Sequence, residues 1–277
     1  SRKISEVPIS SSNGLFSGAT AAQVTIFASP SNAALGLPAS VFGAVVNPTT
    51  GLLQAAAPAD TYNTNNGTYF QTPLDRINVY AAANYEIADN IEFYANGFFN
   101  RNKVTLQLAS SGTFGNTYRL PLNNPFLPAG IRNQLCAGFD TNATLAGIQP
   151  ISAADCAAAA AVVGGTGTPG YIEIPVVAQR RFTEYGPRIN EVVSNVFQVV
   201  GGFRGDIAPS ISYDISAQYG ETQQKQTRGN WGSFSRVQQA LRAFRNASGT
   251  PVCADTGNNC VPLNLFGTLT PAMADYI

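Results

Sequence analysis

Alternating apolar and polar side chains in the middle of the chain restrict it to a few kinds of β structure. In residues 76–87 the odd positions, such as Ile77 and Val79, are apolar, and most even positions are polar. A turn at residues 88–90 follows, and the same alternation resumes over residues 91–99. A period of two residues is typical of a strand with two different faces, so this stretch predicts a β-hairpin.

The second strand of this hairpin is unusually long. Extended character continues to Leu108 after a phase change near Arg101, so that about 18 residues span roughly 60 Å. Globular strands average about 5 to 6 residues, whereas a transmembrane β-strand needs about 9 to 11. Either the strand breaks near Arg101, or it belongs to a tall barrel that projects beyond a membrane.

A second hairpin is predicted further along the chain. Residues 194–207 place Phe197 and other apolar side chains on one face and polar side chains on the other. A turn at residues 208–210 leads into residues 211–220, which alternate without a fault. Residues 172–188, which precede this hairpin, also look extended.

Composition weakens most catalytic hypotheses. Charged residues make up 12% of the chain, against about 25% in average proteins, yet no apolar run approaches the roughly 20 residues of a membrane helix. The 16 basic residues balance the 16 acidic ones, so no nucleic-acid partner is indicated. The chain has no histidine, and no enzyme motif is present. We therefore expect no enzymatic activity, no cofactor and no metal site.

The four cysteines fall into two local pairs. Cys136 and Cys156 are separated by 20 positions, and Cys253 and Cys260 by 7. Neither pair has the spacing of a zinc or thioredoxin-type motif. We predict two disulfides formed in an oxidising compartment, with free buried thiols as the alternative.

Three long segments separate and flank the hairpins. The first has weak strand character only near residues 24–27 and 41–46, and short helices are expected at 131–136 and 153–163, from Phe234 onward, and after Thr270. The predicted organisation is one incomplete barrel domain: residues 1–62 as an extracellular loop, 63–110 as the first hairpin, 111–171 as a disulfide-containing extracellular loop, 172–228 as the second hairpin, and 229–277 as an extracellular loop with short helices.

The order of turns and long segments is not symmetrical. Both short turns fall at one end of the predicted strands, whereas the long segments and both cysteine pairs fall at the other. Short periplasmic turns opposite long extracellular loops are typical of a bacterial outer-membrane barrel. Aromatic residues such as Tyr85, Phe93 and Tyr213 lie near the short turns, where an interfacial girdle is expected. A soluble β-sandwich is the alternative.

Several phrases of the chain resemble the barrel region of TonB-dependent receptors, the active transporters of the Gram-negative outer membrane. They are F-Q-T-P-L-D-R before the first strand, N-Y-E-I-A-D-N-I-E-F-Y-A across the first turn, R-R-F-T-E-Y-G-P-R followed by F-Q-V-V-G-G-F-R-G, and the closing N-C-V-P-L-N-L-F-G. The resemblance covers about two thirds of the chain, from Tyr62 onward. Residues 1–60 match only as a variable loop would.

The resemblance implies an all-β fold, part of a large antiparallel transmembrane barrel. Such receptors have about 22 strands around an N-terminal plug, and neither the plug nor enough strands to close a barrel are visible here. We therefore expect an internal fragment of a longer polypeptide. The implied partners are outer-membrane lipid, a small-molecule nutrient (a metal chelate, vitamin or carbohydrate), and the TonB complex acting through a plug domain outside this chain.

Two sets of residues are candidates for ligand contact. Arg180, Arg181 and Arg188 crowd a segment expected near the outer mouth, where arginine forks suit an anionic ligand; the alternative is an ion-pair network with Glu184. Trp231, the only tryptophan, could stack on a planar or sugar ligand, the alternatives being membrane-interface anchoring and loop packing.

The remaining polar side chains of the strands are explained by a barrel interior, where they would contact the plug or water. The rival functional hypothesis is a surface β-protein without active transport, either an adhesin or another ligand-binding module, or a passive barrel. The polar residues assigned to the interior are Asn78, Asn84, Glu86, Asn96, Gln198, Arg204, Asp214 and Gln218.

Overall fold

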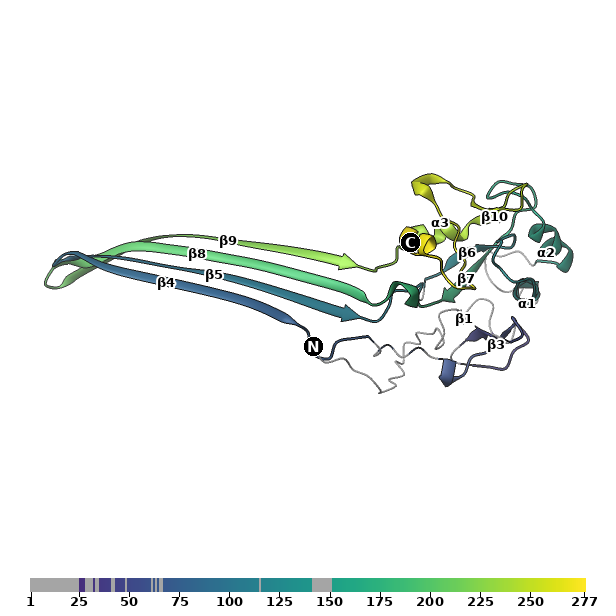
Figure 1. Ribbon diagram of the computed structural model, residues 1–277, viewed down its shortest axis with the longest axis horizontal. Helices are drawn as coiled ribbons and strands as arrows, with labels where there is room; N and C mark the ends of the chain where they lie inside the picture. The colour runs from purple at the N-terminus through teal and green to yellow at the C-terminus, as the bar shows by residue number, and fades with distance from the viewer. Residues whose placement is uncertain are drawn as a thin grey trace. The chain divides into compact units, whose positions relative to one another are not determined.

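The computed structural model divides the chain into two compact units (Figure 1). The long-strand unit contains Thr68–Leu108 and Arg188–Gly229, and the disulfide unit contains Ala109–Pro187, Asn230–Ile277 and the described part of Ser5–Gly67. Antiparallel β structure predominates, as the sequence predicted. The structure describes residues 25–27, 32, 35–40, 43–47, 49–60, 62, 64, 67–114, 116–140 and 151–277.

Four strands lie side by side in the long-strand unit (Figure 1). Their order in the sheet follows their order in the chain, and each pairs antiparallel with the next. Both predicted hairpins are therefore present, and they adjoin in one sheet. The strands are β4 (Leu74–Ala88), β5 (Ile91–Leu108), β8 (Arg188–Ala208) and β9 (Ile211–Gly229).

The two hairpin turns have the same construction. Residues 89–90 and 209–210 form two-residue turns, and the register shifts by one residue just before each of them. The additional residue is Ile87 in one hairpin and Ile207 in the other, within the related sequences I-A-D-N-I and I-A-P-S-I. The predicted three-residue turns are thus two-residue turns, because the alanine after each isoleucine still pairs as part of its strand.

Strand β5 does not break near Arg101. It pairs with β8 without a register shift from Glu92 to Leu108. The alternation changes phase near Arg101 because the apolar side chains move to the other face of the same strand. Val104 and Leu106 lie on the face that carries polar residues nearer the turns. Strand β5 is therefore continuous from Ile91 to Leu108.

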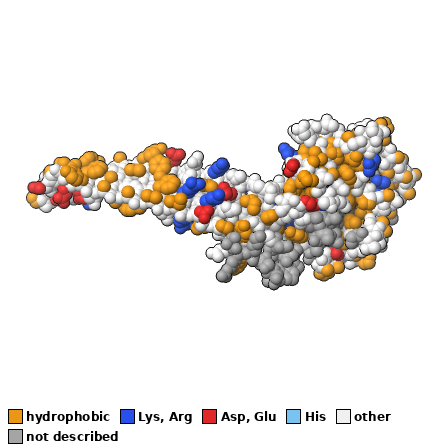
Figure 2. Space-filling model, viewed as in Figure 1, with side chains coloured by type: hydrophobic (Ala, Val, Ile, Leu, Met, Phe, Trp, Pro, Cys, Tyr) orange, Lys and Arg blue, Asp and Glu red, His pale blue; other side chains and the backbone are white. Residues whose placement is uncertain are grey.

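One face of the long-strand sheet is apolar and exposed within the described residues. The facing pair Phe93 and Phe203 has ring centroids 5.4 Å apart, and Figure 2 shows hydrophobic side chains spread along these strands. No layer of described residues covers the large side chains of this apolar face, and more than half of the accessible surface remains exposed for Ile77, Val79, Tyr85, Val199, Ile215 and Tyr219.

The opposite, polar face is held together by hydrogen bonds between side chains of neighbouring strands. Most of these residues have an even number, as period-two alternation requires. An exception to its polarity is Tyr80, which faces Phe98 on the neighbouring strand. The bonded pairs are Arg76 with Asn102, Asn78 with Asn100, Glu92 with Arg204, Gln198 with Gln218, and Asn190 with Gln226.

The disulfide unit contains a five-stranded antiparallel sheet that the sequence did not predict. Its middle strand comes from the first long segment and pairs with a strand near residue 177. The predicted boundary of the second hairpin at residue 172 is wrong, because residues 173–179 join this sheet and β8 begins at Arg188. In spatial order the strands are β3 (Leu53–Ala55), β2 (Ala44–Val46), β1 (Thr25–Phe27), β7 (Glu173–Gln179) and β6 (Tyr118–Pro121).

The predicted short helices are all present in the disulfide unit. The Thr270 hydroxyl accepts the backbone N–H of Met273 at 3.3 Å, and a proline follows it at the first helical position. No helix in the described ranges has both the length and the hydropathy that a membrane-spanning helix requires. The elements are α1 (Ala129–Asp140), α2 (Ala153–Ala160), α3 (Phe234–Leu241), α4 (Pro271–Tyr276), the hairpin β10 (Ala243–Arg245) and β11 (Pro251–Cys253), and the 3-10 turns η1 (Pro58–Asp60), η2 (Thr183–Tyr185) and η3 (Gly257–Asn259).

The three long segments share one hydrophobic core. Leu53 of the first segment, Leu120 and Ile174 of the second, and Leu263 of the third are buried in it. Both predicted disulfides form: Cys136 with Cys156 joins α1 to α2, and Cys253 with Cys260 closes the segment after β11. These segments are therefore not separate loops, because together they bury a core of their own.

Candidate functional site

The side chain of Arg180 lies inside the disulfide unit. It is inaccessible to solvent, and its Nη2 donates hydrogen bonds to Glu184 at 2.5 Å and to the carbonyl of Gly267 at 2.7 Å. Glu184 also accepts the backbone N–H of Leu269 at 3.0 Å. Burial lowers the pKa of Arg180, and the hydrogen bond to Glu184 opposes that shift. This position does not fit the predicted contact with an anionic ligand, and the ion-pair alternative describes it.

Arg181 is also buried. Its Nη1 donates to the carbonyl of Ser110 at 2.8 Å, and its guanidinium lies 4.7 Å from the ring centre of Phe114 and 5.5 Å from that of Tyr62. The third predicted arginine, Arg188, begins β8 in the other unit. The three arginines of the predicted cluster therefore belong to two units: Arg180 and Arg181 are buried in the disulfide unit, and Arg188 is a strand residue of the long-strand unit.

Trp231 lies at the surface of the disulfide unit with 42% of its area exposed. Together with Tyr185 and Arg236 it lines a hollow of about 320 Å³. Phe234, which the sequence places nearby, packs instead on the ring of Tyr118 at 5.0 Å. A ligand-stacking role for Trp231 remains a prediction.

A larger pocket lies over the exposed side of α3. It has a volume of about 600 Å³, which is within the range of small-molecule sites, about 300 to 1,000 Å³. We call it the α3 pocket. Sequence reasoning missed it because its walls come from three separate segments, and the residues that matter for its chemistry are Thr166, Phe234, Gln239, Arg242, Phe244 and Asp255.

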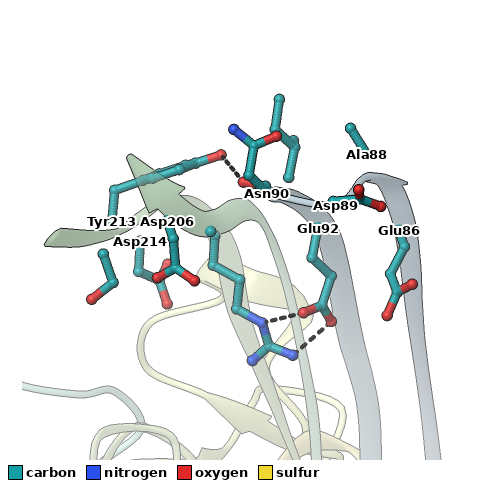
Figure 3. A pocket seen from close by; sticks show the side chains of 12 residues that line it. Glu86, Ala88, Asp89, Asn90, Glu92, Asp206, Tyr213 and Asp214 are labelled. Atoms are coloured by element: carbon teal, nitrogen blue, oxygen red, sulfur yellow. Dashed lines mark hydrogen bonds and ion pairs between the residues drawn. The ribbon is translucent and has the colours of Figure 1, made fainter. Parts of the chain in front are cut away.

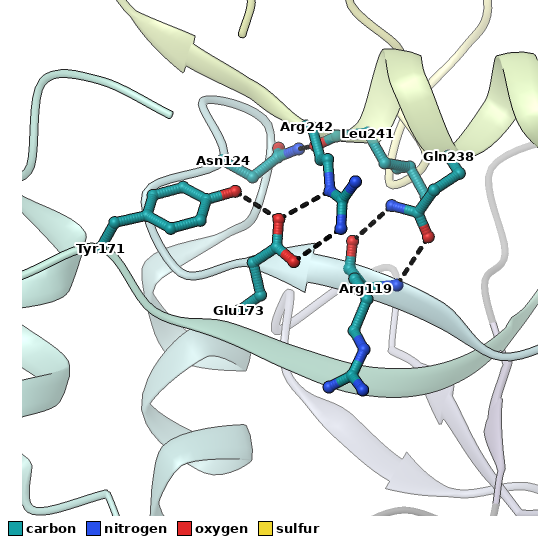
Figure 4. A network of polar contacts seen from close by, with 7 residues as sticks. All are labelled: Arg119, Asn124, Tyr171, Glu173, Gln238, Leu241 and Arg242. Atoms are coloured by element: carbon teal, nitrogen blue, oxygen red, sulfur yellow. Dashed lines mark hydrogen bonds and ion pairs between the residues drawn. The ribbon is translucent and has the colours of Figure 1, made fainter. Parts of the chain in front are cut away.

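A polar network fixes one side of the α3 pocket (Figure 4). Arg242 donates to both carboxylate oxygens of Glu173, at 2.8 and 3.0 Å, and Tyr171 donates its hydroxyl to the same carboxylate. The hydrogen bond to Glu173 raises the pKa of Arg242. Burial is the main cause that raises the pKa of Tyr171, and its hydrogen bond to Glu173 raises that pKa further. The Gln238 amide pairs with both backbone groups of Arg119. The guanidinium of Arg242 is thus held in a fixed orientation.

A second pocket, of about 500 Å³, lies at the turn end of the long-strand unit (Figure 3). Arg204 donates to both carboxylate oxygens of Glu92, at 2.8 and 2.6 Å. Within the described ranges no group of three or more Cys, Asp or Glu side chains is arranged to hold a metal ion. The other carboxylates that line this turn-end pocket are Glu86, Asp89, Asp206 and Asp214.

Comparison with known proteins adds no relative: no protein-family model matches this chain, and no curated protein matches it. A functional proposal therefore rests on the sequence resemblance and on the geometry of the described residues. Two structural features bear on function: the exposed apolar face of the long strands and the α3 pocket.

Proposed function

We propose that this chain forms part of the barrel wall and the outer, ligand-binding region of a TonB-dependent receptor in a Gram-negative outer membrane. In this proposal the receptor binds a scarce nutrient outside the cell. It then imports the nutrient with energy that the TonB complex transmits from the proton-motive force to a plug domain. The sequence resemblance supplies this mechanism, and the geometry of the long strands supports the membrane location.

The exposed apolar face carries the proposal. On β4 it extends from Ile77 to Ile87, and on β8 from Phe197 to Ile207. Ten residues of strand span about 33 Å, or about 25 Å along the membrane normal at a tilt of about 40°. The lipid-facing band of an outer-membrane barrel is also about 25 Å tall. Soluble proteins rarely expose so large a continuous apolar surface.

Charged residues lie beyond one end of this band on the same face. Arg101 and Glu221 occupy the first positions past it, and Lys103 forms an ion pair with Glu191 at 2.9 Å. Figure 2 shows basic and acidic side chains gathered there. The two short turns lie at the other end. Charged residues on the lipid face are strongly disfavoured at the centre of a bilayer. An apolar band with charged residues only beyond its end therefore supports strands that cross a bilayer.

The polar face is assigned to the barrel interior. Its cross-strand hydrogen bonds satisfy amide, carboxylate and guanidinium groups without lipid contact. Within the described residues, β4 and β9 each pair on one side only. An open sheet edge is not tolerated in lipid, because its backbone groups would lack partners. We therefore propose that further strands complete the barrel around a plug.

The disulfide unit is assigned to the extracellular side. The segments that build it leave the long strands at the end opposite the two short turns, which is where outer-membrane barrels carry their long loops. Its two disulfides suit an oxidising environment.

Expression of the full-length gene product in a Gram-negative host tests the proposal. The full-length protein should fractionate with the outer membrane, and protease added to intact cells should cleave the present chain within the disulfide unit and not at its two short turns. Uptake of its nutrient should stop when the tonB gene is deleted. A product recovered in the soluble fraction would refute the membrane assignment. Outer-membrane recovery with uptake that survives the deletion would favour a passive barrel.

A further inference from the structure

The exposed side of α3 forms the floor of the α3 pocket. Phe234 and Gln238 are four residues apart on one side of the helix, and Arg242, the residue that caps its C-terminal end, lines the pocket beside them. Val237 and Leu241 lie on the buried side and pack into the core. The helix and its C-cap residue therefore bring one aromatic ring and one guanidinium to the pocket, while the Gln238 amide pairs with the backbone of Arg119.

The walls of the pocket are fixed by hydrogen bonds. On one side, Asn123 donates to the carbonyls of Val162 and Gly164, at 2.9 and 2.8 Å. On the other, Gln239 donates to the carbonyl of Gly257 at 2.9 Å, within the loop closed by the Cys253–Cys260 disulfide. A pocket whose walls are already ordered loses little conformational entropy when a ligand binds.

The two walls also touch each other. A Cβ atom added at Gly165 would lie 2.4 Å from the Cβ of Ala254, so only glycine permits this close approach. The loop that contains Gly165 and Thr166 thus packs directly against the disulfide-closed loop, and the pocket has a closed rim at that point.

The charges of the pocket do not suit an anionic ligand. The Nε and Nη2 atoms of Arg242 are occupied by Glu173, which neutralises its charge. Asp255 adds a carboxylate to the lining, and its Oδ1 accepts the Gly257 N–H at 2.9 Å. A ferric chelate or another polyanion would therefore meet no net positive charge.

The groups left for a ligand combine aromatic surface with hydrogen-bonding atoms. The ring of Phe234 is 49% exposed, and Phe244 is partly exposed in the same lining. Arg242 Nη1 offers donors and Asp255 Oδ2 is an acceptor. A sugar ring matches this set, because the C–H groups of its face pack on an aromatic ring while the hydroxyls at its edge bond to polar groups.

We infer that the α3 pocket binds a neutral carbohydrate, with Phe234 as the stacking platform and Arg242 and Asp255 as hydrogen-bonding groups. The inference rests on the proposed function and assigns its substrate class, a short neutral oligosaccharide. It disfavours the metal chelate that was equally open from the sequence.

The test uses the full-length protein in detergent micelles and four neutral trisaccharides: maltotriose, cellotriose, xylotriose and chitotriose. Binding is measured by isothermal titration calorimetry and by saturation-transfer NMR. At least one trisaccharide should bind, and Phe234→Ala should weaken it roughly tenfold. Phe234→Leu keeps an apolar contact with Tyr118 but removes the aromatic face, so it should also weaken binding. Leu52→Ala removes an exposed apolar side chain outside the pocket and should leave the affinity unchanged.

Three results would overturn the inference: none of the trisaccharides binds, the Phe234 variants bind as tightly as the natural protein, or ferric citrate displaces the bound sugar. Failure of the inference and failure of the proposed function are distinguishable. A protein that assembles in the outer membrane without binding sugar contradicts only the inference. A protein that binds sugar through Phe234 but does not enter the membrane contradicts only the proposed function.

Discussion

The hydroxyl of Tyr94 donates a 2.6 Å hydrogen bond to Asp214 although strand β8 lies between the two residues. The tyrosine ring crosses that strand at Gly202, where an added Cβ would lie 2.7 Å from the ring carbon Cζ and 2.7 Å from the carbonyl oxygen of Ile215. Arg204 approaches the same ring at 5.4 Å while it holds Glu92. Three strands are thus joined on the polar face near the turns.

Replacing Gly202 with alanine should break this connection, because the new methyl group occupies the space of the Tyr94 ring. We expect the free energy of unfolding to fall by about 1 to 3 kcal/mol, measured by urea denaturation in detergent micelles. Gly201→Ala is the matched control, since the nearest atom to its added Cβ is 3.9 Å away. Equal losses for the two variants would show that the ring crossing does not matter.

The buried ion pair of the disulfide unit should be sensitive to the loss of one partner. Arg180→Met leaves Glu184 without its cation inside the core, and we expect a loss of about 3 to 5 kcal/mol in unfolding free energy. The control is Arg242→Met, whose side chain is 39% exposed in its pair with Glu173 and should cost about 1 kcal/mol or less. Thermal denaturation of both variants measures the difference. A smaller loss for Arg180→Met than for the control would contradict its assignment as a structural arginine.

The two disulfides should differ in their contribution to stability because they close loops of different length. On the chain-entropy estimate, removing the Cys136–Cys156 bond, which spans 20 positions, costs about 3 kcal/mol. Removing the Cys253–Cys260 bond, which spans 7, costs about 2 kcal/mol. Paired Cys→Ser variants, compared by resistance of the disulfide unit to protease, give the order. The reverse order would mean that local packing outweighs loop entropy.

Alkaline pH should destabilise the disulfide unit through Tyr118. Burial raises the pKa of Tyr118 to about 12, above the value of about 10 in an unfolded chain. The unfolded chain therefore loses this proton first, so stability that is complete below pH 10 declines as the pH rises through 12. The slope for one proton is at most about 1.4 kcal/mol per pH unit.

Urea denaturation at pH 9 and at pH 11.5 measures this effect, and Tyr118→Phe serves as the control. The variant keeps the ring that packs on Phe234 and removes the titrating group, so its stability should change less between the two pH values. An unchanged pH dependence in the variant would assign the effect to other tyrosines, such as Tyr171 and Tyr185, whose pKa values burial also raises.

The elements that could be predicted are those whose signal is local. Both hairpins follow from the period-two alternation, α3 from the spacing of Phe234, Val237 and Leu241, and α4 from Thr270 and the proline after it. The disulfide partners are near neighbours in sequence, so pairing each cysteine with the closest one was sufficient.

The five-stranded sheet could not be predicted because its signal is not local. Strand β1 has three residues, too few to show a period, and its Ile26 pairs with Ala178 far along the chain. Burial of Arg180 was equally hidden, since its partners include a carbonyl at Gly267. The α3 pocket shares this property, because Thr166, Phe234 and Asp255 become neighbours only after folding.

The central claim, that the apolar face of the long strands meets lipid, is tested most directly by two substitutions on one strand. Ile215 lies midway between Ile211 and Tyr219 on the apolar face of β9 with 69% of its area exposed, and Gln218 lies on the polar face of the same strand and bonds to Gln198. We expect Ile215→Arg to cost about 2 to 4 kcal/mol of folding free energy in a bilayer and to deplete the protein from the outer membrane. Gln218→Arg should assemble normally. Normal assembly of Ile215→Arg together with failure of Gln218→Arg would contradict the account.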